Sequence, residues 1–177
     1  MTTVDGDRLR AVLAAVCAPV TVVTTTRAGG APRGATVSSF TSLSLDPPLV
    51  SVAFDRRSTL LAEVLDARKF GVNLLGHGQD DLAVRFATRG ADRFGGETAW
   101  FADRGLPRLR DAAGWVACDL DRVVEAGDHL LLFGLVTDLG RTDLPPLVYA
   151  HRTFGTHSRF AERPRPLIAD QIAACAR

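Results

Sequence analysis

The chain has 177 residues, and 46% of them are hydrophobic, which is enough for one domain with a substantial core. Its 21 Lys and Arg residues nearly balance its 20 Asp and Glu residues, and this net charge of +1 provides no field that would recruit nucleic acid or an anionic membrane. The N-terminus, MTTVDGDRLR, carries acids where a signal peptide needs an apolar core, and no apolar run approaches the roughly 18 residues of a membrane span, so we expect a cytoplasmic protein with a small-molecule partner.

The first predicted element is a short amphipathic helix from Asp7 to Cys17. Its apolar residues recur at helical spacing, so we expect this helix to lie on a hydrophobic surface; they are Leu9, Val12, Leu13 and Val16. Pro19 ends the helix, a β-branched strand follows over Val20 to Thr26, and Arg27 to Gly30 form a turn.

A strand lined with hydroxyl groups is predicted from Ala35 to Leu45. Successive residues alternate, and one face carries Thr36, Ser38, Ser42 and Ser44. Asp46-Pro47-Pro48 breaks the strand, because proline has no N–H to donate, and the chain returns as a second strand from Leu49 to Phe54. The sequence therefore predicts a hairpin.

A loop with two positive charges and two hydroxyl groups follows the hairpin. Asp55-Arg56-Arg57-Ser58-Thr59 directly precedes the apolar residues of a predicted helix that starts near Ser58, and such a loop-to-helix junction suits a phosphate. An ordinary solvated turn would have the same composition, so the pattern alone does not distinguish a phosphate site from such a turn.

The middle of the chain adds a strand, a helix and a long loop. We predict the strand over Lys69 to Leu75, with Asn73 either a ligand or a filler, and the helix over Gln79 to Ala87, with Leu82 and Phe86 facing the core. Arg89 and Arg93 follow the helix, where a charged surface also explains them. Gly95 to Arg110 shows no sustained period, so we expect an excursion over the surface.

Two long strands and a short one complete the pattern. We predict strands over Ala112 to Val124 and His129 to Thr137, joined by a turn at Glu125 to Asp128; the second strand is apolar on both faces, which predicts a central position. A last, short strand is expected over Pro145 to Tyr149. The tail from 161 to 177 shows helical spacing, which favours a short helix.

These elements amount to about six or seven strands with two or three helices. Short turns between neighbouring strands are typical of an antiparallel barrel, whereas βαβ alternation and a GxGxxG motif are missing, which argues against a Rossmann fold.

Several blocks of the sequence resemble the flavin reductase-like family, the FMN-binding split-barrel reductases. The blocks are GATVSSFTSLSLDPPLVSVAFDRRST, VNLL, DLAVRFATRGADRF and Gly127-Asp128-His129, and the resemblance runs from about Leu13 to about Phe154. It implies a mainly β fold, a split antiparallel Greek-key β-barrel over residues 1–160, followed by the tail. It also implies a homodimer with flavin at the subunit interface.

The resemblance further implies an NAD(P)H:flavin oxidoreductase. Such an enzyme reduces FMN or FAD by hydride transfer from NADH or NADPH and supplies the reduced flavin to a separate flavin-dependent monooxygenase, for example one that acts in aromatic or polyketide metabolism. His129 matches the histidine that the family places at the nicotinamide site. The positions that match the family's flavin contacts, or border them, are Thr36, Val37, Ser38, Ser39, Phe40, Asp55, Arg56, Arg57, Ser58, Thr59, Asn73, Arg85, Phe86, His151 and Arg152.

No other catalytic machinery is visible in the sequence. GxSxG and HExxH motifs are missing, and Cys17, Cys118 and Cys175 lack the spacing of a metal or disulfide framework, so we expect no metal site. Hydride transfer to a flavin needs neither a nucleophile nor a metal, because the cofactors carry the chemistry. Two alternatives stay open: a flavoprotein that keeps its FMN and acts directly on an organic substrate, and a non-catalytic flavin-binding sensor or scaffold.

Overall fold

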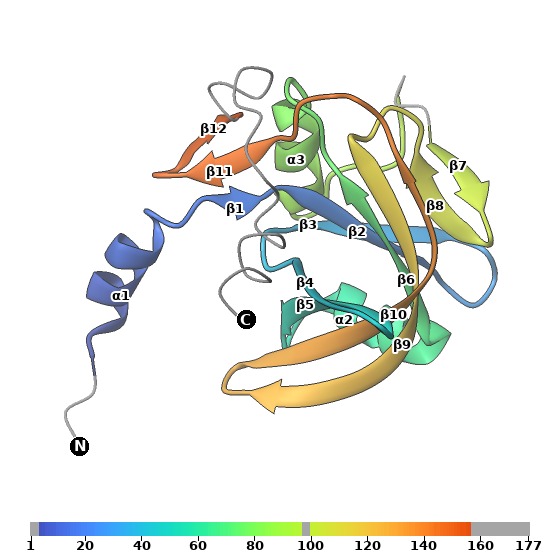
Figure 1. Ribbon diagram of the computed structural model, residues 1–177, viewed down its shortest axis with the longest axis horizontal. Helices are drawn as coiled ribbons and strands as arrows, with labels where there is room; N and C mark the ends of the chain where they lie inside the picture. Colours follow the sequence, from blue (N-terminus) through green and yellow to red (C-terminus); the bar gives the residue numbers. More distant parts are fainter. Residues whose placement is uncertain (1–3, 97–99, 157–177) are drawn as a thin grey trace, which may run out of the picture.

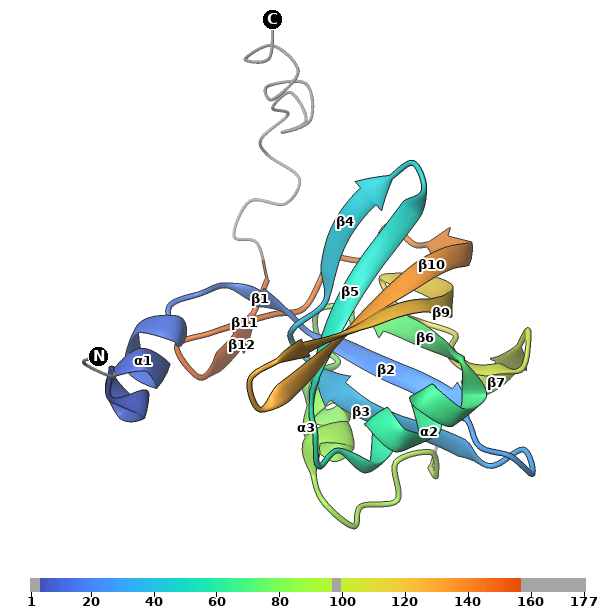
Figure 2. The same ribbon diagram turned by 90° about the horizontal axis from the view of Figure 1, so that it is seen from below.

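A seven-stranded antiparallel sheet forms the body of the protein and curls into a barrel (Figures 1 and 2). The computed structural model describes residues 4–96 and 100–156. The sheet has the order β3-β2-β6-β9-β10-β5-β4. Its strands are β2 (Thr21–Thr26), β3 (Pro32–Val37), β4 (Thr41–Leu45), β5 (Pro48–Asp55), β6 (Lys69–Leu74), β9 (Gly114–Ala126) and β10 (His129–Arg141). The expectation of a mainly β, antiparallel barrel is confirmed.

The barrel closes where the chain passes from β3 to β4. These consecutive strands lie at opposite edges of the sheet, and residues 38–40 cross between them. The hydroxyl of Ser39 donates to the carbonyl of Ala53 in β5 and accepts from its amide, both at 2.9 Å. The prediction of one strand from Ala35 to Leu45 is therefore wrong, because the chain leaves the ladder with β2 at Val37 and joins β5 at Thr41.

The predicted hairpins are present. β4 and β5 pair directly around the turn at Asp46 and Pro47. β9 and β10 are each 13 residues long and pair along their length, and β10 lies between β9 and β5, so its predicted central position is confirmed.

Two helices pack on opposite faces of the β2–β3 pair (Figure 1). α2 (Thr59–Ala67) packs against β2, β3 and β6 and buries Leu60, Leu61 and Val64. α3 (Asp80–Ala87) packs against β3 and β2 and buries Leu82, Ala83 and Phe86. Both helices occupy the predicted positions.

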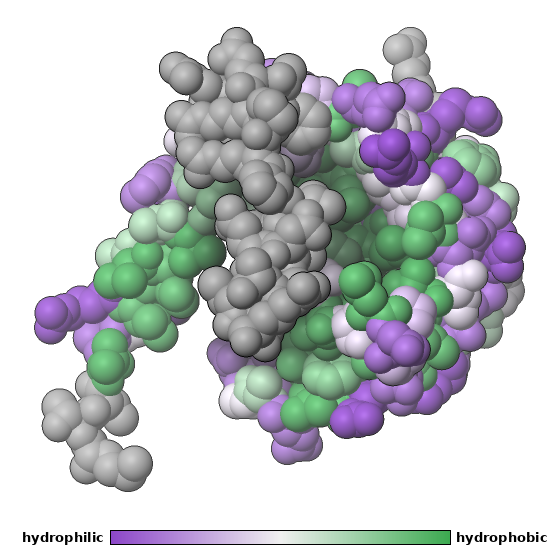
Figure 3. Space-filling model, in the orientation of Figure 1, coloured by the Kyte–Doolittle hydropathy of each residue, from purple (hydrophilic) through white to green (hydrophobic). Residues whose placement is uncertain are grey.

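The N-terminal helix α1 (Gly6–Leu13) projects away from the barrel (Figures 1 and 2). None of its residues is buried, and 48% of Leu9 and 70% of Val12 are exposed. The expectation that this helix lies on a hydrophobic surface is therefore wrong within one chain, and the helix ends at Leu13 rather than at Cys17. Its apolar stripe stays on the surface (Figure 3).

The segment predicted as an irregular surface excursion contains a hairpin instead. β7 (Trp100–Asp103) and β8 (Leu106–Leu109) pair around a turn at Arg104 and Gly105, which both have positive φ. Leu106 and Leu109 are buried, so the hairpin belongs to the core. Strands of four residues are too short for a period to show in the sequence.

A small second sheet lies beside α1. It consists of β1 (Ala18–Pro19), β11 (Val148–Ala150) and β12 (Thr153–Gly155), with β11 in the middle. β11 overlaps the strand predicted at Pro145 to Tyr149 but starts later, at Val148, and extends to Ala150. The predicted helix in the tail lies outside the described residues.

Candidate functional site

The turn after β5 is the centre of the candidate site. Asp55 ends the strand, its carbonyl accepts from the Ser58 amide at 2.9 Å, and Ser58 caps α2 by accepting from the Leu61 amide at 3.4 Å. This cap leaves the amides of Thr59 and Leu60, in the first turn of the helix, without an intrahelical acceptor. The turn thus has the predicted form of a loop that enters a helix N-terminus.

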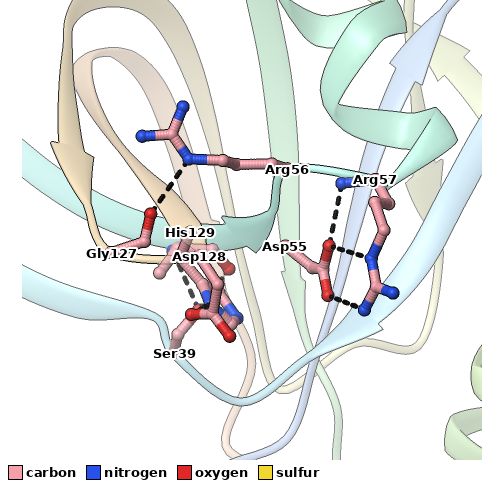
Figure 4. Close-up of polar contacts among 8 residues, drawn as sticks. Ser39, Asp55, Arg56, Arg57, Gly127, Asp128 and His129 are labelled. Carbon is pink, nitrogen blue, oxygen red and sulfur yellow. Dashed lines mark hydrogen bonds and ion pairs between the residues drawn. The ribbon is translucent and has the colours of Figure 1, made fainter.

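Arg56 and Arg57 point in opposite directions from this turn (Figure 4). Arg56 binds the β9–β10 turn: its amide donates to the carbonyl of Asp128 and its Nε to the carbonyl of Gly127, both at 3.0 Å. It also lies 3.3 Å from a carboxylate oxygen of Glu125. Arg56 therefore fastens two turns together, whereas Arg57 extends on the other side.

Arg57 lines a cavity of about 630 Å³ at the N-terminus of α2. Arg89 and Arg93, from the loop after α3, line the same cavity. The Arg93 guanidinium is fixed by hydrogen bonds to the carbonyls of Gly34, at 2.8 Å, and Thr88, at 3.1 Å. The sequence placed Arg89 and Arg93 in a loop but gave no reason to pair them with Arg57. The full lining is Ala35, Asp55, Arg57, Ser58, Thr59, Leu60, Arg89 and Arg93.

Asp55 is the one carboxylate in this lining among the described residues. Its two oxygens accept from Nε and Nη2 of Arg57 at 3.1 and 3.0 Å, and Oδ1 also accepts from the Arg57 amide at 2.8 Å (Figure 4). These bonds hold the pKa of Asp55 far below its usual range and raise that of Arg57. Both groups are therefore charged at neutral pH.

His129 lies next to this turn on the neighbouring strand. It is the direct cross-strand partner of Asp55, and 43% of its side chain is exposed. Its Nδ1 lies 2.7 Å from Oδ1 of Asp128, a contact that lowers the pKa of the Asp128 carboxyl. The structure thus brings the predicted nicotinamide-site histidine to the same end of the barrel as the Arg57 turn.

The hydroxyl groups predicted for cofactor binding are mostly engaged within the protein. Thr36 donates to the carbonyl of Ala83 at 2.6 Å, and Ser39 donates to the carbonyl of Ala53 at the barrel seam, the place where residues 38–40 close the barrel against β5. Val37 is buried in the core, and Phe40 lines a separate apolar hollow with Leu74 and Leu147. Within residues 36–40, Ser38 is the exposed residue, and it lines a hollow next to α1.

Asn73 and Phe86 lie inside the protein rather than at the cavity. Both are completely buried. The Asn73 side-chain amide donates to the carbonyls of Val22 and Pro107 at 3.2 and 3.4 Å, and its oxygen accepts from the Leu109 amide at 2.8 Å. Phe86 packs edge to face against Phe94, with ring centroids 5.1 Å apart. These contacts are structural.

Arg85 lies on α3 close to the loop that carries Arg89 and Arg93. Its Nη1 donates to the carbonyl of Gly95 at 3.3 Å, so its side chain supports that loop.

His151 and Arg152 lie beside α1, in the turn between β11 and β12. Both have positive φ, and the His151 amide donates to the carbonyl of Ala14 at 2.6 Å. Arg152 lines a hollow of about 340 Å³ together with Ser38, Tyr149 and apolar residues next to α1. The structure therefore places Arg152 and Ser38 at a second hollow, with His151 in the adjoining turn, and none of the three lines the Arg57 cavity.

Two further observations bear on the class of site. Within residues 4–96 and 100–156, no group of three or more His, Cys, Asp or Glu side chains is placed to hold a metal ion. None of the helices in the same residues is long and apolar enough to cross a membrane.

The chain matches the family model "Flavin reductase like domain" over residues 13–158. It is 42% identical over 156 residues to the NADH:riboflavin 5'-phosphate oxidoreductase of Streptomyces pristinaespiralis, covering 86% of this chain and 89% of that protein. It is 37% identical over 152 residues to a probable flavin reductase of Rhizobium meliloti, covering 86% of this chain but only 49% of that longer protein.

A solved structure shows the same fold. It is that of BorF, the flavin reductase component of a bacterial two-component tryptophan halogenase, which superimposes with a TM-score of 0.79 at 33% identity and covers 86% of this chain and 98% of the other. The family match spans most of the described barrel, including the Arg57 turn and His129. The chain therefore belongs to the flavin reductase-like family.

Proposed function

We propose that this protein is an NAD(P)H:flavin oxidoreductase that reduces free FMN or FAD and supplies the reduced flavin to a separate flavin-dependent oxygenase. The observation that carries the proposal is the convergence of Arg57, Arg89 and Arg93 on the N-terminus of α2, next to His129. The names of the relatives, an NADH:riboflavin 5'-phosphate oxidoreductase and a reductase component of a two-component system, support the same activity.

The Arg57 cavity has the chemistry of a flavin phosphate site. A phosphate group needs several charge-assisted donors, and guanidinium groups and free amides at a helix N-terminus supply them. Arg57, Arg89 and Arg93 would bind the phosphate oxygens, together with the amides of Thr59 and Leu60. An adjoining hollow of about 390 Å³ shares Thr59, Arg89 and Arg93 with this cavity, so the dinucleotide FAD has room as well as FMN.

Residues 38–40, where the barrel closes, would hold the flavin ring. When bound, flavin supplies an acceptor for a hydride and the nicotinamide supplies the hydride, so the protein has only to hold the two rings together. His129 lies at the same end of the sheet, where it would position the nicotinamide. The role of the protein is thus orientation rather than acid–base or nucleophilic chemistry.

A homodimer forms part of this proposal. An eight-residue helix with no buried residue gains little stability by itself, and the exposed apolar side chains of α1 would be buried by contact with another surface. A second copy that packs against α1 would also close the hollow that contains Ser38 and Arg152. This arrangement would bring those two residues, which do not line the Arg57 cavity within one chain, into a site at the subunit interface.

The partner oxygenase would receive reduced flavin by diffusion in the cytoplasm. The side chain of Arg57 is 89% exposed, so the phosphate site opens directly to solvent. A site of this kind suits a flavin that binds and leaves in each turnover. A flavoprotein that keeps its flavin would need a more enclosed site.

Steady-state oxidation of NADH and of NADPH with free FMN or FAD as the sole acceptor tests the proposal. We expect turnover that saturates with flavin concentration, and a protein that loses flavin on gel filtration. Retained flavin without turnover of added flavin would support the alternative that acts directly on an organic substrate. Flavin binding without oxidation of either nucleotide would support a non-catalytic sensor or scaffold.

A further inference from the structure

Asp55 occupies donors that a flavin phosphate would use. Its carboxylate accepts from Nε, Nη2 and the backbone amide of Arg57, at distances between 2.8 and 3.1 Å. The fork of an arginine presents the same pair of N–H groups to a carboxylate and to a phosphate. The Asp55 carboxylate therefore binds the same N–H groups of Arg57 that a phosphate would bind.

We propose that Asp55 is an internal competitor for the flavin phosphate, which weakens flavin binding and keeps the flavin exchangeable. This inference rests on the proposed function, because it assigns the phosphate to Arg57. The Asp55 carboxylate must release part of the Arg57 guanidinium, or share it with a second anion, whenever a phosphate binds.

Electrostatics favours competition over a purely supporting role for Asp55. A phosphate monoester such as that of FMN carries a charge of about −1.5 to −2 at pH 7. A carboxylate in the lining of the same cavity repels that charge and neutralises one of the three guanidinium groups. Arg93 is held by two backbone carbonyls, so a guanidinium in this cavity can be fixed without an acidic partner.

Arg56, the other arginine of the turn, forms a second acid–arginine pair with Glu125 of β9, and this pair serves as a control. Glu125 lies 3.3 Å from Arg56, on the opposite side of the turn and outside the lining of the cavity. Removing the charge of Glu125 changes the net charge of the protein as much as removing that of Asp55. If only the net charge of the protein determined the affinity for FMN, the two variants would show the same change in affinity.

The test compares Asp55→Asn with Glu125→Gln by fluorescence titration with FMN and with riboflavin, which lacks the phosphate. The side-chain oxygen of asparagine can still accept from the Arg57 amide, so the turn is preserved. We expect Asp55→Asn to lower the Kd for FMN about three- to tenfold, to slow FMN release by a similar factor and to leave the Kd for riboflavin unchanged. Glu125→Gln should leave both Kd values unchanged.

An unchanged or weaker affinity for FMN in Asp55→Asn would overturn the proposal and make Asp55 a positioning residue for Arg57. The effect should also vanish when Asp55→Asn is combined with Arg57→Ala, and its persistence would equally overturn the proposal. If Asp55→Asn does not fold, Asp55→Ser, whose hydroxyl can accept from the same amide, replaces it. Failure of the wild-type protein to turn over any flavin would instead refute the proposed function.

Discussion

Asp55 and His129 are direct partners in the antiparallel ladder, as the last residue of β5 and the first residue of β10. Their β-carbons are therefore neighbours, about 5 Å apart in such a ladder. The loop that carries Arg57 and the turn that precedes His129 leave the sheet at the same end, and hydrogen bonds from Arg56 join them. A flavin phosphate site and a nicotinamide site can thus be held in a fixed relation by two strands.

Replacement of Arg57 should affect ligands that carry a phosphate. Arg57→Ala removes a guanidinium from the cavity, so we expect its Kd for FMN to rise about tenfold while its Kd for riboflavin stays within about twofold of the wild-type value. Arg56→Ala is the control, because Arg56 points to the β9–β10 turn; it should keep the preference for FMN over riboflavin and lose some thermal stability. Equal loss of both ligands in Arg57→Ala would show that the loop only supports the fold.

Replacement of His129 should affect the nucleotide and not the flavin. We expect His129→Ala to raise the KM for NAD(P)H or to slow flavin bleaching in stopped-flow experiments about ten- to a hundredfold, because the imidazole would no longer position the donor. Flavin affinity should stay within about twofold. His77, an exposed histidine before α3, provides the control variant His77→Ala. Normal bleaching by a destabilised His129→Ala protein would mean that His129 only caps the turn.

Replacement of Ser39 should destabilise the barrel. Ser39→Ala leaves both the amide and the carbonyl of Ala53 without their hydroxyl partner, so we expect the free energy of unfolding to fall by about 1–3 kcal/mol. Ser42→Ala, at an exposed position in β4, should change it by less than about 0.5 kcal/mol. Urea denaturation of the three proteins measures the difference, and equal stability of the two variants would remove Ser39 from the seam.

Asn73 should prove to be a core residue. Asn73→Ala leaves buried backbone groups without partners, including the Leu109 amide, so we expect a loss of about 2–4 kcal/mol in stability. The Kd for FMN of the folded variant should remain that of the wild-type protein. A stable variant with weakened flavin binding would instead make Asn73 a ligand of the cofactor.

The buried thiol of Cys118 should make stability depend on alkaline pH. Burial, reinforced by Asp119, raises the pKa of Cys118 to about 12. An unfolded thiol ionises above about pH 9, whereas the folded one stays protonated, so the free energy of unfolding should fall as the pH rises from about 9 to 12. Cys118→Ala should show a smaller fall than the wild-type protein in urea denaturation across this range.

Thiol labelling provides an independent check of the same burial. In a Cys17→Ser/Cys175→Ser variant at pH 8, Cys118 should react with a thiol reagent only at the rate of protein unfolding. Fast labelling of the folded variant would show that Cys118 is accessible.

Local signals in the sequence predicted much of this fold. The prolines after Asp46 mark the β4–β5 turn, α2 starts near Ser58 as expected, and Gly127-Asp128 joins the two longest strands. The break at Ser38 to Phe40 was not predicted, because β3 and β4 have the same alternation on either side of it. The break is defined only by long-range pairing, since β3 pairs with β2 and β4 pairs with β5.

The candidate site depends even more on long-range contacts. Arg57 could be recognised from its position before a helix, but Arg89 and Arg93 join it only because the loop after α3 returns to β3, where Arg93 donates to the carbonyl of Gly34. Asn73 shows the opposite case: a polar residue in an apolar strand is compatible with a ligand, and only its partners on β2 and β8 identify it as part of the core. A sequence period contains no information about such partners.

The hydrogen bonds between Ser39 and Ala53 make one amide a reporter of barrel opening. Most amides in a central strand are protected from hydrogen exchange by their neighbours in the ladder, whereas the Ala53 amide is protected by a side chain from the crossing segment. Its exchange rate therefore follows the separation of residues 38–40 from β5, even while β5 stays paired with β10. A ligand whose ring rests on the crossing segment would slow the exchange of this amide, so occupancy at the ring end of the site can be measured separately from occupancy at the phosphate end.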